Sequence, residues 1–339
     1  MTLPDTHISL AHGNGGRFMR ELIESVFARL LRSDTLDTQA DAVALPWDSA
    51  QGDLIFTTDG FTVQPLEFPG GDIGALAVHG TVNDLAVSGA TPRYLALNVF
   101  VEEGFEIARI ERLMGSLARA ALEAGVQVAT GDTKVLPRGE GGGLYLATTG
   151  IGVRPHGLEL GLHQVRAGDS VLVSGPIGAH GVAVLLAREQ FGLRGDLKSD
   201  SASVLPFTLT LRGMRGLRFM RDPTRGGLAT VVNEIAGATS LGIRLREAAI
   251  PVQPAVQSVC EMLGYDAYYL ACEGRVVAVV AADEAPAALT RWRQLPGGEA
   301  AAIIGEVHAN PSARVVLETL LGGERYLEEL EDDPLPRIC

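Results

Sequence analysis

The chain has 339 residues, of which 46% are hydrophobic and 20% are charged, and its formal net charge is −13 at pH 7. A chain of this length exceeds one ordinary hydrophobic core, so we expect two domains. The excess of negative charge argues against a nucleic-acid ligand and against anionic membrane surfaces. Because the overall field repels anions, any phosphate ligand must be held by local donors or by metal ions.

The sequence contains no apolar run of the length that spans a membrane, and its first five residues lack the basic-then-apolar pattern of a signal peptide. Its three cysteines, Cys260, Cys272 and Cys339, are too few for a disulfide framework, and their spacing matches no zinc motif. We therefore expect a cytoplasmic protein with reduced thiols.

The first half of the chain predicts a mixture of helices and strands. Residues 18–31 place apolar side chains at helical spacing, directly after a glycine-rich opening. Residues 73–87 are apolar at mixed spacing and predict a buried helix that glycine interrupts. The other predicted elements are a helix over 107–124 and strands over 54–58, 94–101, 126–130 and 144–153. We expect the first domain to end at residue 153.

The second half is expected to form another domain over residues 154–323. Its predicted elements are strands over 171–174 and 276–281, helices over 181–189, 228–236 and 252–263, and a polar loop over 195–204. Residues 324–339 concentrate charge and carry Pro334 and Pro336. Such a segment cannot bury a core, so we expect a mobile tail.

A glycine-rich segment, His12-Gly13-Asn14-Gly15-Gly16, precedes the first predicted helix. Glycines let backbone N–H groups approach an anion closely, and the start of the helix adds its positive dipole end. The segment is therefore either a phosphate contact or an ordinary turn before a helix. The sequence contains no G-x-x-x-x-G-K-[ST] pattern, which excludes a P-loop.

Four aspartates stand in short polar contexts between apolar segments. Asp59, Asp84 and Asp132 are predicted where strands or helices give way to turns, and Asp222 precedes the helix over 228–236. Hard cations such as Mg²⁺ take several oxygen ligands and share them with substrate phosphates. Each aspartate alone can equally be a helix cap or a turn former. Together, in a chain without another phosphate motif, they favour a metal–phosphate site.

In their order along the chain, these motifs resemble the aminoimidazole ribonucleotide synthetase-like ATP-binding superfamily, whose relatives include selenophosphate synthetases and thiamine-monophosphate kinases. The resemblance covers essentially the whole chain. It implies a PurM-like α/β (α+β) fold of two domains, in which the N-terminal domain contributes strands to a β-barrel at a homodimer interface. Residues 1–37 then hold a phosphate flap and the first helix, and residues 38–153 form the ATP-binding domain.

The same resemblance implies ATP and Mg²⁺ as ligands, with Asp59, Asp84, Asp132 and Asp222 as the candidate metal ligands. The residues that it places around the nucleotide are His12, Gly13, Asn14, Gly15, Gly16, Asp59, Asp84, Asp132, Thr133, Asp222 and Arg225. Arg225 either contacts phosphate or pairs with Asp222.

The chain ends with a cysteine, in Pro336-Arg337-Ile338-Cys339. The adjacent terminal carboxylate should raise the pKa of this thiol, so the cysteine is a sluggish nucleophile unless a site corrects it. The ending resembles that of the HypE family of hydrogenase-maturation proteins. This implies that the carbamoyltransferase HypF places a carbamoyl group on Cys339, which the chain then dehydrates with ATP to a thiocyanate. The cyanide passes to iron on HypC–HypD, as a ligand for the [NiFe]-hydrogenase centre.

Dehydration of a carboxamide removes two N–H protons, so a base must lie near the carboxamide nitrogen. The family resemblance offers two candidates, Lys134 and Glu273. Lys134 can also be a plain phosphate contact, and Glu273 can also be an exposed carboxylate in a turn.

Two other classes of function stay open on the sequence. One is a different ligase or kinase of the superfamily, although a selenophosphate synthetase should carry a reactive Cys near its N-terminus and a kinase has no use for Cys339. No cysteine precedes Cys260. The other is a non-enzymatic scaffold that carries cyanide on its tail. A scaffold would not need the four aspartates or Lys134.

Overall fold

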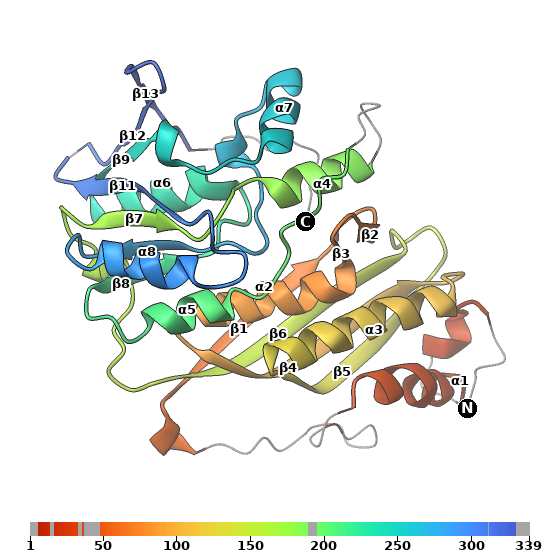
Figure 1. Cartoon of the computed structure of the whole chain (residues 1–339). Coiled ribbons are helices and arrows are strands. Elements are labelled where there is room, and N and C mark those ends of the chain that lie inside the picture. The colour runs from red at the N-terminus through yellow and green to blue at the C-terminus, as the bar shows by residue number, and fades with distance from the viewer. Residues whose placement is uncertain are drawn as a thin grey trace.

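The computed structural model describes residues 6–13, 17–32, 36, 48–188, 195–310 and 312–329. The predicted site residues Asn14, Gly15, Gly16 and Cys339 lie outside these ranges. The described residues form two α/β units, one from each half of the chain (Figure 1).

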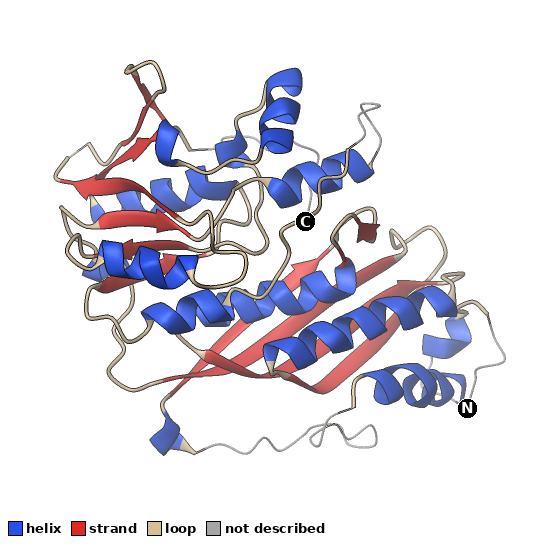
Figure 2. Cartoon of the chain, in the orientation of Figure 1, coloured by secondary structure: helices blue, strands red, loops and turns tan. Residues whose placement is uncertain are grey.

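The first unit contains a four-stranded mixed sheet with strand order β1-β6-β4-β5 (Figure 2). Strand β6 is antiparallel to both β1 and β4, whereas β4 and β5 are parallel. The strands are β1 (Asp53–Phe61), β4 (Thr91–Glu102), β5 (Gln127–Leu136) and β6 (Leu144–Arg154), with a separate hairpin of β2 (Glu67–Phe68) and β3 (Gly71–Asp72).

Two long helices, α2 (Ile73–Val87) and α3 (Ile107–Ala124), cover one face of this sheet (Figure 1). The expected interruption of the helix over 73–87 is wrong, because α2 continues through its glycines. A Cβ at Gly74 would lie 2.1 Å from the carbonyl oxygen of Leu113, and one at Gly80 would lie 2.7 Å from the ring of Phe61. The glycines therefore permit close packing of α2 against its neighbours.

The predicted helix over 18–31 is present as α1 (Arg17–Leu22) followed by the π-helical turn η2 (Ile23–Ala28). It buries Val26 and Phe27 in the same core as α2 and α3. Two short 3₁₀ turns, η1 (Leu10–Gly13) and η3 (Ser49–Gln51), stand on either side of it in the chain.

The other face of the sheet carries exposed apolar side chains. Residues alternate between the two faces of a strand, so Phe61 of β1 points to the helices, whereas Leu54 and Phe56 point away from them. Leu54 is 52% exposed and Phe56 68% exposed, and Phe100 of β4 is exposed as well. We call the surface formed by these three residues the open face.

The second unit contains a seven-stranded sheet with strand order β13-β12-β9-β11-β7-β10-β8. Its strands are β7 (Ser170–Val173), β8 (Leu217–Arg221), β9 (Gly242–Arg246), β10 (Val277–Val280), β11 (Ala302–His308), β12 (Val315–Glu318) and β13 (Glu324–Tyr326). Its helices are α4 (Ala179–Ala187), α5 (Leu205–Leu211), α6 (Gly227–Thr239), α7 (Pro254–Leu263) and α8 (Ala285–Arg293), with 3₁₀ turns η4 (Leu162–Gln164), η5 (Glu247–Ala249) and η6 (Ala267–Tyr269).

Two hydrophobic cores lie on either side of this sheet. One contains residues of α6, and the other contains residues of α5 and α8, including the buried Trp292. The second core also includes Ala86 and Val87 from α2, so the two units share apolar contacts. The predicted strands and helices of this half are all present, and the predicted loop over 195–204 has no helix or strand.

The described part of the expected mobile tail differs from the prediction. Residues Glu324–Tyr326 form β13, which pairs with β12, and the backbone N–H of Leu327 donates to Val315 at 3.0 Å. Leu327 is only 1% exposed, and Arg325 forms a 2.8 Å ion pair with Asp266. An edge strand can keep its charged side chains in solvent, so charge along residues 324–329 did not exclude a strand.

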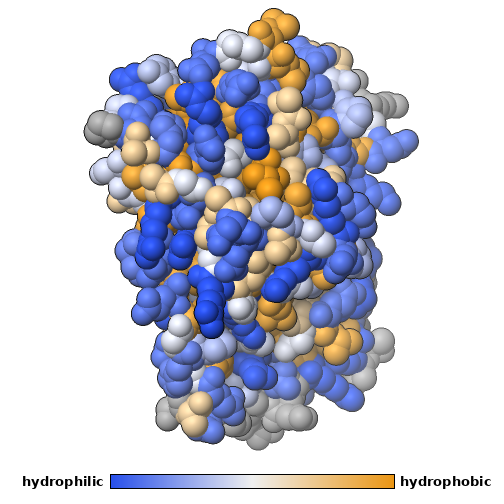
Figure 3. All heavy atoms as spheres, turned by 60° about the vertical axis from the view of Figure 1, so that its left-hand side comes forward, coloured by the Kyte–Doolittle hydropathy of each residue, from blue (hydrophilic) through white to orange (hydrophobic). Residues whose placement is uncertain are grey.

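Hydrophilic side chains predominate on the face in Figure 3, where hydrophobic ones lie between them in separate groups. Within the described ranges, no helix combines the length and the apolar character that crossing a bilayer requires.

Candidate active site

A cavity of about 330 Å³ lies between the two units. Strand β1 and helix α2 form its wall in the first unit, and the segment from β8 into α6 forms its wall in the second. Five of the predicted site residues line it: Asp59, Asp84, Asp222, Arg225 and Glu273. Residues far apart in the sequence thus meet at the boundary of the two domains, where ligand sites are common.

Asp59 and Asp84 face each other from a strand and a helix. Asp59 lies within β1 on the side of α2, because a Cβ added at Gly80 of α2 would lie 3.5 Å from its Oδ2. Asp84 lies within α2 and accepts a 2.8 Å hydrogen bond from the Thr57 hydroxyl of β1. The prediction that turns carry these two aspartates is therefore wrong, and the two side chains lie at the same cavity.

The carboxylates of this cavity are partly removed from water. Burial raises the pKa of Asp59, and this effect exceeds the lowering by the hydrogen bond from the Gly60 N–H and by the charge of Arg225. Burial also raises the pKa of Asp84, opposed by the Thr57 hydrogen bond and increased by the charge of Asp59. For Asp222, burial and then the charge of Asp84 raise the pKa to about 7. The cavity thus holds a desolvated cluster of acids that a cation would stabilise.

Arg225 resolves an alternative that the sequence left open. Its Nη2 lies 3.7 Å from Asp59 Oδ1, so it pairs with Asp59 and not with Asp222. The side chain is 80% exposed and lines the cavity. The guanidinium can therefore meet a phosphate at the mouth of the cavity while staying beside the acids.

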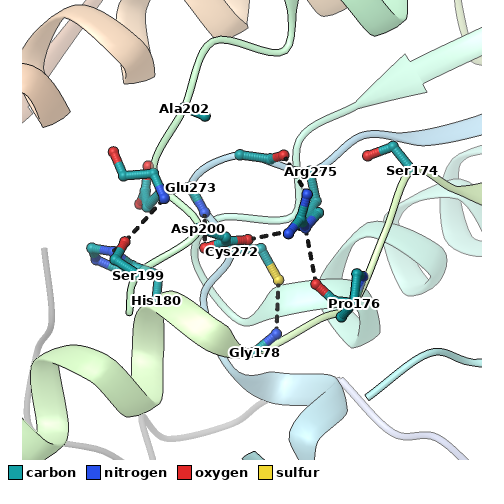
Figure 4. A network of polar contacts seen from close by, with 12 residues as sticks. Ser174, Pro176, Gly178, His180, Ser199, Asp200, Ala202, Cys272, Glu273 and Arg275 are labelled. Atoms are coloured by element: carbon teal, nitrogen blue, oxygen red, sulfur yellow. Dashed lines mark hydrogen bonds and ion pairs between the residues drawn. The ribbon is translucent and has the colours of Figure 1, made fainter. Parts of the chain in front are cut away.

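Glu273 is a buried residue and not an exposed turn carboxylate. Only 4% of it is exposed, and it lines the cavity with the three aspartates. Its backbone N–H donates to Asp200 Oδ1 at 3.2 Å, and its carbonyl oxygen accepts a 3.2 Å hydrogen bond from Asn83 Nδ2. Figure 4 shows Glu273 beside Asp200 and Cys272. Two side chains thus hold its peptide groups from either side.

Asp132, Thr133 and Lys134 do not line this cavity. They lie inside β5, where Asp132 pairs with Asn98 and Lys134 with Phe100, so both side chains belong to the open face. Lys134 Nζ lies 2.8 Å from Asp132 Oδ2. The hydrogen bond that Lys134 donates, together with its positive charge, lowers the pKa of Asp132. Thr133 is buried on the opposite side of the strand. The predicted turn at Asp132 is wrong, and Asp132 does not join Asp59, Asp84 and Asp222 at the cavity of this chain.

His12 and Gly13 also lie away from the cavity. They belong to η1, which contacts β5, and His12 is buried with its Nδ1 2.9 Å from the hydroxyl of Ser9. The predicted residues therefore divide into two groups, one at the cavity and one along β5.

Across the part of the chain that the structure describes, no three His, Cys, Asp or Glu side chains approach closely enough to hold a metal ion by themselves. Sequence analysis missed several polar residues that shape the site. These are Thr57, Asn83, Asp200 and Arg275, which bind other protein groups.

Family models match both halves of the chain. Residues 39–154 match the N-terminal domain of the AIR synthase-related proteins, and residues 166–318 match their C-terminal domain. The chain is 45% identical to the carbamoyl dehydratase HypE of Azotobacter vinelandii over 340 aligned positions, which cover 100% of this chain and 99% of that protein.

Solved structures give the same result. The structure of hydrogenase maturation protein HypE in complex with ATP matches with a TM-score of 0.92 and 43% identity, over 97% of this chain and 99% of that one. A chain of the HypE–HypF complex matches with a TM-score of 0.79 and 41% identity, over 91% and 99%. Thiamine-monophosphate kinase from Stenotrophomonas maltophilia K279a shares the fold alone, at 23% identity and a TM-score of 0.65 over 90% and 96%.

The two α/β units and the acid-lined cavity between them define an AIR synthase-related protein. Within that class the chain belongs to the HypE family of carbamoyl dehydratases, which act in hydrogenase maturation. It is therefore an enzyme of the dehydratase class, and the scaffold alternative is set aside.

Proposed function

We propose that the chain binds ATP with Mg²⁺ in the cavity and uses it to dehydrate an S-carboxamide on its own Cys339 to a thiocyanate. The observation that carries this proposal is the convergence of Asp59, Asp84, Asp222 and Glu273 on one cavity in a chain of the HypE family. The related HypE that was solved with ATP supports the choice of nucleotide.

The cavity residues fit Mg²⁺. In nucleotide sites, Mg²⁺ is usually held by one or two carboxylates together with phosphate oxygens and water, so a protein cage of three ligands is not required. Asp59 and Asp84 come from one unit and Asp222 from the other, and burial together with the charges of Asp84 and Asp59 raises the pKa of Asp222. When bound, the ion neutralises charge on the phosphate oxygens.

Dehydration needs ATP because an amide oxygen is a poor leaving group. Transfer of the γ-phosphoryl group to the carboxamide oxygen makes a phosphate leaving group, and its elimination gives the thiocyanate. The balanced reaction converts the S-carboxamide and ATP into the S-cyanide, ADP, inorganic phosphate and one proton. Arg225 at the cavity mouth contacts a phosphate in this scheme, and Glu273 accepts a proton from the carboxamide nitrogen.

The remaining candidates act from a second copy of the chain. Asp132 and Lys134 lie on the open face beside Phe100, and Leu54 and Phe56 expose apolar surface there. A homodimer that pairs through this face buries that surface and brings Asp132 and Lys134 to the interface. In this proposal Thr133 and the segment His12–Gly16 belong to the same completed nucleotide site.

The cysteine has to meet the cavity and a carbamoyl donor in turn. Ten residues follow Glu329, and ten extended residues span at most about 33–36 Å. The donor that we propose is the carbamoyltransferase HypF, as in the related HypE–HypF complex. The acceptor is iron on HypC–HypD, in the assembly of the [NiFe]-hydrogenase centre. We place these steps in the cytoplasm, where a reactive Cys339 stays reduced.

Replacing Cys339 by Ala tests the proposal. The variant is expected to bind Mg-ATP with the affinity of the unmodified protein and to form no thiocyanate, because it has no sulfur to carry the carboxamide. Nucleotide binding is measured by calorimetry and product by cyanide release. Thiocyanate formation at the normal rate by Cys339→Ala would rule out the cysteine as the carrier.

A further inference from the structure

One residue of α2, Asn83, makes three hydrogen bonds to the second unit. Asn83 is buried and precedes Asp84 in the same helix. Its Nδ2 donates to the carbonyl oxygens of Ala202 at 3.1 Å and Glu273 at 3.2 Å, and its Oδ1 accepts from the backbone N–H of Val204 at 2.8 Å. All three partners belong to the second unit.

The peptide groups of Glu273 are held from its other side as well. Its N–H donates to Asp200, whose Oδ2 lies 3.4 Å from Nε of Arg275 (Figure 4). Arg275 also donates to the carbonyl oxygen of Pro176 at 2.9 Å. A Cβ at Gly274 would lie 1.9 Å from the carbonyl oxygen of Asp200, so the two segments pack with no room for a side chain. The backbone that carries Glu273 is thus fixed on three sides.

We propose that Asn83 is a positioning residue: by binding the backbone of Glu273, it fixes the position of the Glu273 carboxylate relative to Asp84. One turn of α2 carries both functions, because Asp84 lines the cavity while the neighbouring Asn83 binds the peptide of Glu273. The inference rests on the proposed function, in which Glu273 is the base and Asp84 a ligand of Mg-ATP.

The contacts of Asn83 limit what its loss can do. Asn83 bonds to main-chain atoms of the second unit and is not among the residues that line the cavity. Its removal should therefore leave Asp84 and the nucleotide contacts in place, while the carbonyl oxygen of Glu273 loses the bond from Asn83 and keeps the 3.3 Å hydrogen bond from the N–H of Ala202. Small displacements of a base lower the rate of the chemical step strongly.

The test is a double-mutant cycle of Asn83→Ala with Glu273→Gln in the full-length protein. The rate of thiocyanate formation is measured in a single turnover, starting from protein carbamoylated at Cys339, and Mg-ATP affinity is measured by calorimetry. We expect Asn83→Ala to lower the rate roughly 10- to 100-fold while the Mg-ATP Kd stays within about twofold. In the Glu273→Gln background it should lower the rate no further, because it acts through Glu273.

Asn233 provides the matched control. Its Nδ2 likewise donates to two backbone carbonyl oxygens, those of Ala229 at 2.9 Å and Leu327 at 3.0 Å. Asn233→Ala should therefore lose comparable hydrogen bonds and leave the rate unchanged. If Asn83→Ala does not fold, Asn83→Leu replaces it, since it keeps the volume of the side chain, adds no charge and removes both donated bonds.

The outcomes separate the two claims. A full rate in Asn83→Ala, or a loss that adds to that of Glu273→Gln, overturns the positioning role and leaves the proposed function standing. A full rate in Glu273→Gln overturns Glu273 as the base, and the positioning role fails with it. A loss in Asn83→Ala that arises only from weaker Mg-ATP binding also contradicts the proposal.

Discussion

At the scale of single residues, the cavity gathers carboxylic acids whose charged forms are disfavoured by burial. Arg225 pairs with Asp59 from an exposed position. Burial raises the pKa values of Asp59, Asp84 and Asp222, and the charges of neighbouring acids raise those of Asp84 and Asp222 further. Groups with shifts of this kind, gathered in one cavity, are typical of functional sites.

Asp84→Asn tests the ligand role directly. It keeps the size of the side chain and removes the charge, so Mg-dependent ATP binding should weaken by at least about tenfold. The free energy of unfolding without nucleotide should not fall, because burial already disfavours the charged form. Calorimetry with and without Mg²⁺ measures the first effect and thermal unfolding the second; equal ATP affinity in both proteins would refute the role.

Motifs identified the residues that line the cavity better than the residues that support them. Asp59, Asp84 and Asp222 stand in short patterns that resemble a superfamily, and they do meet in one cavity. Asn83 and Asp200 act on backbone atoms more than seventy positions away, and no local pattern indicates such a partner. Contacts of that kind depend on the packing of two domains, which the sequence does not display.

At the scale of elements, the segment over 195–204 forms hydrogen bonds that link the two units. The N–H of Ser199 donates to Pro69 of the first unit at 2.8 Å. The half-buried His79 and the buried His180 also contact this segment: His79 Nδ1 lies 3.0 Å from the Ser201 hydroxyl, and His180 Nδ1 lies 2.9 Å from the Ser199 hydroxyl. Burial lowers the pKa of each histidine to about 4.

These two histidines predict a loss of stability in acid. Below their unfolded pKa of about 6.5, the unfolded chain binds protons that the folded one does not, so stability falls as the pH drops from about 6.5 to about 4. His79→Gln and His180→Gln should each flatten the slope of unfolding free energy against pH in that window. The change in slope corresponds to the loss of up to one proton taken up on unfolding. Urea unfolding at several pH values measures the slope.

The exposed His163 provides the control for this prediction, since it lies on the surface in η4. An unchanged slope in both His79→Gln and His180→Gln, or equal flattening in His163→Gln, would contradict the explanation.

Elements with a complete apolar pattern were predicted well from the sequence. The predicted bounds of α2 and α3 agree with the structure, because each helix has a long apolar surface that ends at a turn. The edge strand β13 was missed, since only Leu327 after it is buried and its own residues are exposed. The strands with Asp59 and Asp132 extend beyond their apolar parts, so their ends were predicted too early.

At the scale of the whole molecule, the open face is the feature that a single copy does not explain. The two-domain architecture expected from chain length and family resemblance is confirmed by both family models. The sequence pattern alone could not separate Asp132 from the other acids. That separation follows from strand order and from the alternation of side chains between the faces of the sheet.

Phe56→Asp tests the proposed homodimer. Phe56 is 68% exposed in the single chain, so a charge there should leave the fold intact and prevent pairing of two open faces. Light scattering coupled to size exclusion should give twice the chain mass for the unmodified protein and the single-chain mass for the variant. A single-chain mass for the unmodified protein would exclude the dimer, and with it the proposed role of Asp132 and Lys134.

The central claim is the ATP-dependent loss of water from a carbamoyl group on Cys339. It is measured by mass spectrometry of the C-terminal peptide after incubation with the carbamoyltransferase, carbamoyl phosphate and Mg-ATP. We predict a carbamoyl adduct on Cys339 that loses one water only when ATP is present. A carbamoyl adduct that persists with ATP, or an unmodified Cys339 beside an active transferase, would contradict the account.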